Sequence, residues 1–176
     1  MRNTILLLII TFGLFYCTPP KYIAKRQSEI VHLDLDNSII NYIPVADVDL
    51  KNSRILETSY NLIVNKKYSK LERYINGLEN SREATSDLYL SKALLFISKK
   101  EYETAAQNLQ KIKNDDFKLL KQLLSTDLDY ELAKINGTMD YKGFLHRYQE
   151  LMDYYPDDTS LKKILAIRIR FMRYNY

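Results

Sequence analysis

The sequence contains few of the residues that break or cross-link a polypeptide. Among its 176 residues there are four glycines, four prolines, one cysteine and no tryptophan. A single cysteine cannot form a disulfide within the chain, so the fold has to depend on packing. No proline occurs between Pro44 and Pro156, where an average usage of about 5% would give roughly five. A stretch so poor in helix breakers is predicted to be helical.

Strong charge of either sign is also missing. Lys and Arg number 26 and Asp and Glu number 22, which gives a formal net charge of +4. A nucleic-acid-binding protein normally presents a clustered basic face, and this small excess does not indicate one. Nucleic acid is therefore not expected as a partner. The length is sufficient for one domain with a hydrophobic core.

The sequence shows no recognisable set of reactive residues. The two histidines, His32 and His146, lie in different segments and have no partner motif. A Gly-rich phosphate loop, an HExxH motif and a CxxC motif are all missing. The paired aspartates lack the Gly and the distal Glu of a calcium loop. From these absences we expect no metal, no cofactor and no enzymatic activity.

The chain begins with a short apolar leader. Ile5 to Tyr16 is an apolar run of 12 residues that follows Arg2 and is interrupted only by a Thr and a Gly. A membrane-spanning helix needs about 20 apolar residues, whereas the core of a signal peptide needs about 7–15. We therefore predict a signal peptide over residues 1–16. An uncleaved anchor and a differently processed protein are the alternatives.

The end of the leader, Leu14-Phe15-Tyr16-Cys17, resembles a bacterial lipobox, the motif that the lipoprotein signal peptidase recognises. Leu14 matches the residue preferred three positions before the cysteine. Phe15 and Tyr16 are larger than the small residues usual at the next two positions. The resemblance implies that Cys17 carries a diacyl group that holds the protein to a membrane. It also implies a place in the bacterial cell envelope, at the inner or the outer membrane.

Residues 17–51 differ in pattern from the rest of the chain. An early Thr-Pro-Pro sequence suits an extended tether better than the start of a helix. Polar and apolar residues then alternate over residues 30–35, which is the period of a strand. We predict an extended strap that lies on the helical body. The alternative is a weak edge hairpin about Asn37 and Ser38.

The body of the chain contains a phrase that recurs around Tyr68, Tyr102 and Tyr141, which are 34 and 39 residues apart. Core-type residues follow each Tyr at positions +3, +7 and +10, so that four side chains share one face of a helix. Other apolar residues precede each Tyr at −6 and −13 and belong to a preceding helix. The pattern predicts three helix–turn–helix pairs over residues 52–158.

This spacing resembles the tetratricopeptide repeat (TPR), a unit of about 34 residues with an aromatic residue opening its second helix and a small residue three positions later. Residues 86–119 match best, through Ala93, Tyr102 and Ala105. The pairs before and after them match less well. The resemblance implies an all-α, TPR-like α-solenoid preceded by an extended N-terminal segment. A plain helical bundle with chance periodicity is the alternative.

The third pair has five additional residues before it. From Phe117 to Ile135 the apolar residues recur at steps of three and four, which predicts one helix of about five turns.

The last part of the chain, residues 159–176, is predicted to be a helix that caps the stack. An Asp-Thr-Ser sequence at its start is a typical N-cap signal. Apolar residues cover one arc of this helix, and Arg168 lies in the middle of that arc. We predict that Arg168 extends to solvent or pairs with a carboxylate of the preceding helix, such as Glu150 or Asp153. Contact with an anionic ligand or lipid is the alternative.

The resemblance also implies a concave groove, lined by the first helix of each pair, that binds a peptide or protein segment. Carried over position by position, the groove residues are Tyr60, Ile63, Val64, Leu90, Leu94, Ile97, Asp129, Tyr130, Ala133 and Asn136. The Asn and Lys clamp that some members use for a terminal carboxylate is not present. The groove should therefore be apolar and aromatic. The chain's own residues 29–50 could fill it in place of a partner.

Together these features predict a non-enzymatic helical-repeat lipoprotein that acts as a protein–protein interaction scaffold in the bacterial cell envelope. Its partners would be a protein or peptide in the groove and a membrane at the lipid anchor. In outline it resembles the repeat-containing lipoproteins of outer-membrane and secretion machinery. The alternative is a structural or membrane-surface protein whose basic, amphipathic C-terminal helix contacts anionic lipid.

Overall fold

The computed structural model describes residues 29–33, 35–45, 53–80, 85–113, 117–154 and 159–175. Cys17, the predicted signal peptide and the predicted tether lie outside the described residues. Within the described ranges, none of the helices combines the length and the apolar character needed to cross a membrane.

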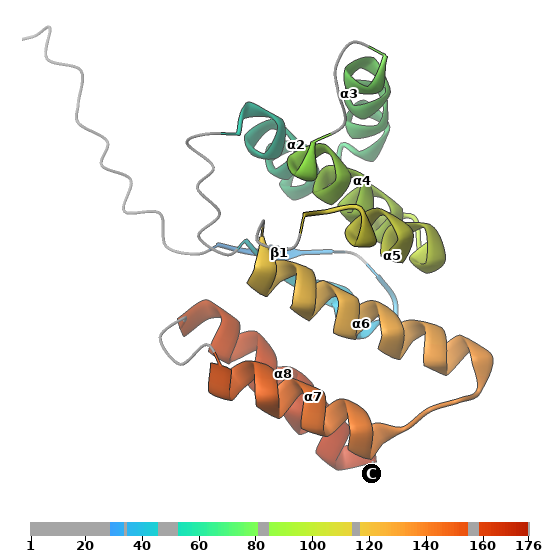
Figure 1. The fold of residues 1–176 in the computed structure, drawn as a ribbon, viewed down its shortest axis with the longest axis vertical. Coiled ribbons are helices and arrows are strands. Elements are labelled where there is room, and N and C mark those ends of the chain that lie inside the picture. The colour runs from blue at the N-terminus through green and yellow to red at the C-terminus, as the bar shows by residue number, and fades with distance from the viewer. Residues whose placement is uncertain are drawn as a thin grey trace, which may run out of the picture.

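Seven α-helices and a short β-ribbon make up the described part of the chain (Figure 1). The helices are α2 (Arg54–Val64), α3 (Tyr68–Glu79), α4 (Ser86–Ser98), α5 (Tyr102–Gln110), α6 (Lys118–Asn136), α7 (Tyr141–Tyr154) and α8 (Thr159–Asn175). The ribbon consists of β1 (Glu29–His32), the 3-10 helix η1 (Ile39–Asn41) and β2 (Tyr42–Val45). The expectation of a mainly helical fold is confirmed, and the two paired strands correspond to the alternative of a hairpin about Asn37 and Ser38.

The segment that precedes the helices folds back on itself as a hairpin. β1 pairs antiparallel with β2, with Glu29 opposite Val45. Between the strands, the Ser38 Oγ atom accepts a hydrogen bond from the Ile40 backbone N–H at 3.2 Å and caps η1. The preferred prediction of a single extended strap is therefore wrong for these residues, because each strand satisfies the backbone groups of the other. The hairpin nevertheless lies on the helical body, as the strap was expected to do.

The helices follow one another in pairs, as the recurring phrase predicts. Tyr68, Tyr102 and Tyr141 are the first residues of α3, α5 and α7, the second helix of each pair. The third pair was expected to have a long first helix, and this is also confirmed, since α6 has 19 residues. The helix expected over 159–176 corresponds to α8. The packing is consistent with a helical bundle or with a helical repeat.

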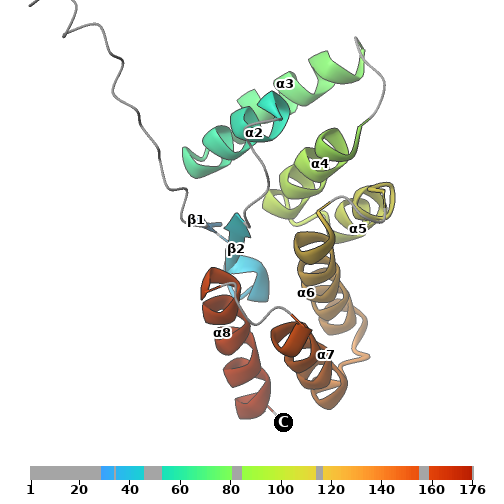
Figure 2. The same cartoon turned by 60° about the vertical axis from the view of Figure 1, so that its left-hand side comes forward.

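Two hydrophobic clusters hold these elements together. The first joins α2 to α6 and includes four buried side chains of the hairpin, which are Leu33, Leu35, Ile40 and Ile43. The second joins α6, α7 and α8 around Tyr130, Tyr148 and Leu165. Figure 2 shows the hairpin between α2 and α8, and it contacts α2, α6 and α8. Since α6 contributes to both clusters, it connects the two halves of the fold.

Candidate interaction site

Half of the predicted groove residues are buried in the first hydrophobic cluster. Five of the ten are buried in the cluster that contains the hairpin, and these are Tyr60, Ile63, Leu90, Leu94 and Ile97. Burial raises the pKa of the Tyr60 hydroxyl above its usual value, so this group stays protonated. Because the chain's own residues cover these side chains, they offer no open surface in this arrangement. A partner in the concave groove stays a prediction. The five side chains share a cluster with residues of the hairpin, which agrees with the alternative that the chain's own residues 29–50 fill the groove.

The other five predicted groove residues do not lie together on one surface. Val64 is exposed at the end of α2, and Asn136 is exposed at the end of α6. Asp129 is also exposed and accepts a hydrogen bond from an arginine of α7. Tyr130 is buried in the second cluster, where burial raises its pKa to about 12, and Ala133 packs beside that cluster. No common binding surface is formed by these five.

Polar side chains of α6 hold the tip of the hairpin. The Glu131 Oε1 atom accepts hydrogen bonds from the Ser38 hydroxyl at 2.8 Å and from the Ile39 backbone N–H at 2.5 Å. Lys134 donates to the Asn37 carbonyl oxygen at 3.0 Å. Glu131 is buried, and a buried donor or acceptor left without its partner costs about 1–3 kcal/mol. The hairpin is thus attached by specific polar contacts as well as by apolar packing.

A buried ion pair joins α6 to α8. Arg168 donates from Nε to Asp127 Oδ1 at 2.6 Å and from Nη2 to Asp127 Oδ2 at 2.5 Å. Arg168 Nη2 also donates to the Tyr42 carbonyl oxygen of β2 at 3.0 Å, and the Tyr148 hydroxyl donates to Asp127 Oδ1 at 2.8 Å. The side chains of Asp127 and Arg168 are 0% and 1% exposed. One ion pair therefore connects three helices and the hairpin.

The predicted pairing of Arg168 with a carboxylate is confirmed, but its expected partner is wrong. Neither Glu150 nor Asp153 of α7 pairs with it; the partner is Asp127 of α6, which faces α8 across the second cluster. Burial by itself disfavours the charged guanidinium, yet the Asp127 carboxylate raises the pKa of Arg168 above its usual value. Two parallel, charge-assisted hydrogen bonds make this a strong pairing. Arg168 is therefore neutralised inside the protein and is not open to an anionic ligand or lipid.

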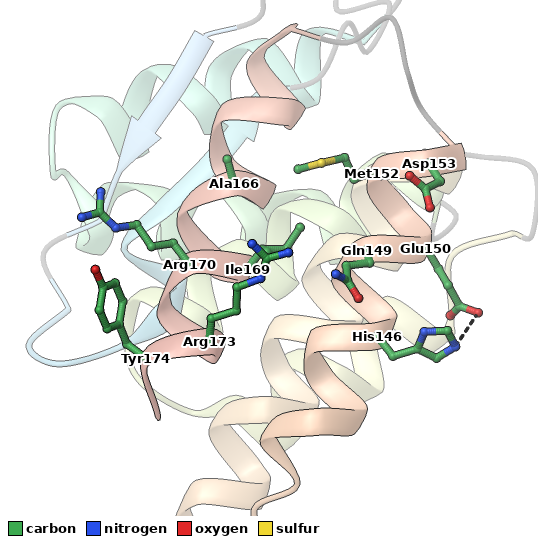
Figure 3. Close-up of a pocket in the computed structure, with 10 residues that line it drawn as sticks. All are labelled: His146, Gln149, Glu150, Met152, Asp153, Ala166, Ile169, Arg170, Arg173 and Tyr174. Atoms are coloured by element: carbon green, nitrogen blue, oxygen red, sulfur yellow. Dashed lines mark ion pairs between the residues drawn. The ribbon is translucent and has the colours of Figure 1, made fainter. Parts of the chain in front are cut away.

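An open groove runs between α7 and α8 and has a volume of about 960 Å³ (Figure 3). Glu150 and Asp153 on α7 give one wall an acidic character, and Arg173 on α8 gives the other a basic one. Met152 and Ile169 extend into the space between the helices and form an apolar floor. An acidic wall, a basic wall and an apolar floor suit an amphipathic segment of a partner protein.

A second groove, of about 560 Å³, lies between α6 and α7. Its cations already have partners within the chain. The Lys118 ammonium lies 5.4 Å from the centroid of the Tyr154 ring, and Lys121 donates to a backbone carbonyl oxygen at 2.7 Å. Arg147 donates to Asp129 at 2.7 Å. This groove therefore offers less free charge than the groove between α7 and α8.

Candidate metal ligands were compared within the part of the chain that the structure describes. Among those residues, no group of three or more His, Cys, Asp or Glu side chains is arranged to hold a metal ion. His146 pairs instead with Glu150 on its own helix, at 3.3 Å between Nε2 and Oε1. Both side chains are exposed to solvent.

Comparison with known proteins yields little. No family model matches the chain, and no solved structure matches it. The chain is 29% identical over 137 residues to the large tegument protein deneddylase of human herpesvirus 7 (strain JI). The match covers 71% of this chain and 7% of that protein, so the chain spans a small part of its curated relative. The repeat, the lipid anchor and the scaffold role are not addressed by this match and stay predictions.

The match does correct one prediction. The similar protein is a deneddylase by name, which contradicts the expectation that the chain has no enzymatic activity. That expectation rested on the absence of known motifs, and such an absence is weak grounds for excluding an activity. We withdraw it.

Proposed function

We propose that this protein is a TPR-like helical-repeat lipoprotein that serves as a protein–protein interaction scaffold in the bacterial cell envelope. The repeat interpretation is supported by Tyr68 and Tyr102, which occupy the same position in successive helix pairs, 34 residues apart. One observation carries the proposal. The chain's own hairpin packs in the same hydrophobic cluster as the predicted groove residues of α2 and α4, and the groove between α7 and α8 is open.

The partner is assigned to the α7–α8 groove because of its position and its charges. In a helical repeat each unit normally buries its surface against the next one, and the last unit needs a polar cap. Here the groove between the second helix of the last pair and the capping helix α8 has an apolar floor at Met152 and Ile169 between walls of opposite charge. A partner helix with one apolar face flanked by basic and acidic residues would satisfy all three features.

Charge reversal in the groove tests the scaffold role. Asp153→Lys combined with Arg173→Glu reverses both walls at exposed positions, so the fold should survive. Recovery of partner proteins by the full chain, measured by crosslinking in envelope fractions and quantitative mass spectrometry, should fall about tenfold, the effect of about 1.4 kcal/mol. Glu103→Lys on α5 is the matched control, because it reverses an exposed charge away from the groove. Unchanged recovery with an intact circular dichroism spectrum would rule out this groove as the partner site.

The lipid anchor needs a measurement of its own. Mass spectrometry of the mature N-terminus should find a chain that begins at a diacylated Cys17. An unmodified Cys17 within an intact leader would refute the anchor and leave the scaffold proposal to be judged by the groove variants.

A further inference from the structure

We propose that one face of α8 lies on an anionic lipid bilayer. This face, called here the α8 outer face, consists of Lys163, Ile167, Arg170, Phe171 and Tyr174. All five side chains are exposed. Their spacing places them on one side of the helix, since residues three and four apart are neighbours on a helical surface.

Three apolar side chains of the α8 outer face are exposed, and one of them, Phe171, also contacts the buried Tyr130 ring edge-on at 6.1 Å between centroids. Ile167, Phe171 and Tyr174 are 53%, 44% and 77% exposed, and they stand at positions i, i+4 and i+7. A helix that lies in the membrane interface places such a row at the boundary between head groups and acyl chains. Tyrosine is favoured at this level because its ring is apolar and its hydroxyl stays hydrated.

The charge of α8 is complementary to an anionic surface. Residues 159–175 contain no Asp or Glu, and the four cations Lys162, Lys163, Arg170 and Arg173 are all exposed. Among the described residues none of these four has a carboxylate partner within ion-pair distance. The fifth cation of the helix, Arg168, is neutralised by Asp127. Arg170 also lies over the Tyr174 ring, 5.7 Å from its centroid. Each of the four exposed cations is attracted by the negative potential of anionic lipid head groups.

The shape and charge of the α8 outer face favour a bilayer over other partners. The face is the convex surface of one helix, which fits a flat lipid surface better than the groove that a protein ligand usually needs. A second copy of the chain would place two sets of four cations against each other. A nucleic acid would match the charge but would gain nothing from an exposed Ile167. Arg170 and Tyr174 also line the α7–α8 groove at its α8 side, so that the outer face adjoins the groove (Figure 3).

The path of the chain allows the proposed lipid on Cys17 and the α8 outer face to reach the same membrane. Cys17 lies 12 residues before Glu29, the first residue of β1, and 12 residues span at most about 40 Å. The hairpin packs against α8, where Arg168 bonds the Tyr42 carbonyl oxygen. This point rests on the proposed lipidation, whereas the docking of α8 does not.

A single tryptophan reports the depth of α8 in the bilayer, because the chain contains none. The full chain carrying Tyr174→Trp is mixed with vesicles of phosphatidylglycerol and phosphatidylcholine that contain brominated acyl chains. We expect the emission to shift to the blue and to be quenched. The matched control is Val64→Trp on α2, at an exposed position, which should remain unquenched on the same vesicles. Absence of quenching for Tyr174→Trp, or equal quenching on vesicles of phosphatidylcholine alone, would overturn the proposal.

Removal of charge tests the electrostatic contribution to docking, measured with the Tyr174→Trp variant. Adding Lys163→Gln and Arg170→Gln should lower the ratio of docked to undocked α8 about 25-fold, at about fivefold per charge. Lys70→Gln with Lys113→Gln removes the same charge at exposed positions outside α8 and should change the ratio less than about twofold. Equal effects of the two pairs would overturn the docking face.

Loss of the apolar side chain separates a bilayer from a soluble polyanion. Ile167→Gln should weaken docking on anionic vesicles and leave the binding of heparin unchanged. If Ile167→Gln changes neither the docking on vesicles nor the binding of heparin, the α8 outer face binds polyanions in general, and the proposal of a bilayer is overturned. The mass of the mature N-terminus, measured on the same samples, separates a failure of the lipid anchor from a failure of α8 docking. The circular dichroism spectrum confirms that each variant is folded.

Discussion

Asp127 and Glu131 lie four residues apart on the face of α6 that is turned into the protein, and both are buried. Each carboxylate binds a residue far away in the chain. Asp127 pairs with Arg168, 41 residues later, and Glu131 binds Ser38, 93 residues earlier. Acidic residues within the apolar arc of a helix are therefore a usable sign of buried partners. At the scale of single residues, these two acids join the ends of the described chain to its middle.

Arg168→Met should lower the free energy of unfolding by about 3–5 kcal/mol, because the Asp127 carboxylate then stays buried without its cation. Asp127→Leu should have a similar cost. The double variant should recover much of the loss, since no buried charge remains. Urea unfolding followed by circular dichroism gives all three values. Simple addition of the two single effects would argue against a coupled pair, and Arg170→Met, at an exposed position, should stay within about 0.5 kcal/mol.

At the scale of elements, the turns within the helix pairs show how the repeat is built. Lys66 and Lys100 occupy equivalent turn positions, 34 residues apart, and adopt left-handed backbone with φ of 53° and 62°. The turn of the third pair uses Gly137 for the same purpose, with φ of 68°. A left-handed backbone costs a residue with a Cβ atom about 1–2 kcal/mol, a cost that glycine avoids. The first two turns thus keep a strain that the third turn lacks.

Lys100→Gly should raise the free energy of unfolding by about 1 kcal/mol, because glycine adopts this backbone conformation without steric conflict. Gly137→Ala is the reciprocal variant and should lower the free energy by about the same amount. A Cβ atom added at Gly137 would meet nothing within 4 Å, so the effect reports the backbone alone. Thermal and urea unfolding measure both changes. A loss of stability in Lys100→Gly would show that the lysine side chain matters more than its backbone.

At the scale of the whole molecule, the hairpin is part of the core. Ile40 and Ile43 belong to the same cluster as Leu94 in the middle of α4. α6 then extends this packing into the second cluster through Leu123 and Tyr130. Elements that share one continuous core are expected to unfold together. The proposed scaffold is therefore a unit that includes its N-terminal ribbon.

Ile40→Ala should lower the free energy of unfolding by about 2–5 kcal/mol, the usual cost of a cavity at a buried isoleucine. Ile135→Ala on α6 is the matched control, since Ile40 is 0% and Ile135 is 67% exposed. The control should change stability by less than about 0.5 kcal/mol. Denaturant unfolding monitored by tyrosine fluorescence and by circular dichroism compares the two. Equal small effects would mean that the hairpin is only loosely attached to the helices.

The sequence by itself determined the helices and their order in pairs. Tyr68, Tyr102 and Tyr141 mark the start of the second helix in each pair, and the run of apolar residues after Phe117 marks the long helix α6. These features are local, because the face of a helix and its turns depend on residues a few positions apart. Periodicity over such short distances can be recognised without a structure.

Only the tertiary structure decided what those helices pack against. Three features depend on distant segments: the pairing of β1 with β2, the choice of Asp127 for Arg168, and the burial of Leu94 in one cluster with residues of the hairpin. Arg168 and the Tyr42 carbonyl group meet across 126 positions of the chain. A buried charge demands a partner whatever the fold, but the partner is selected by which surfaces come together when the two clusters close.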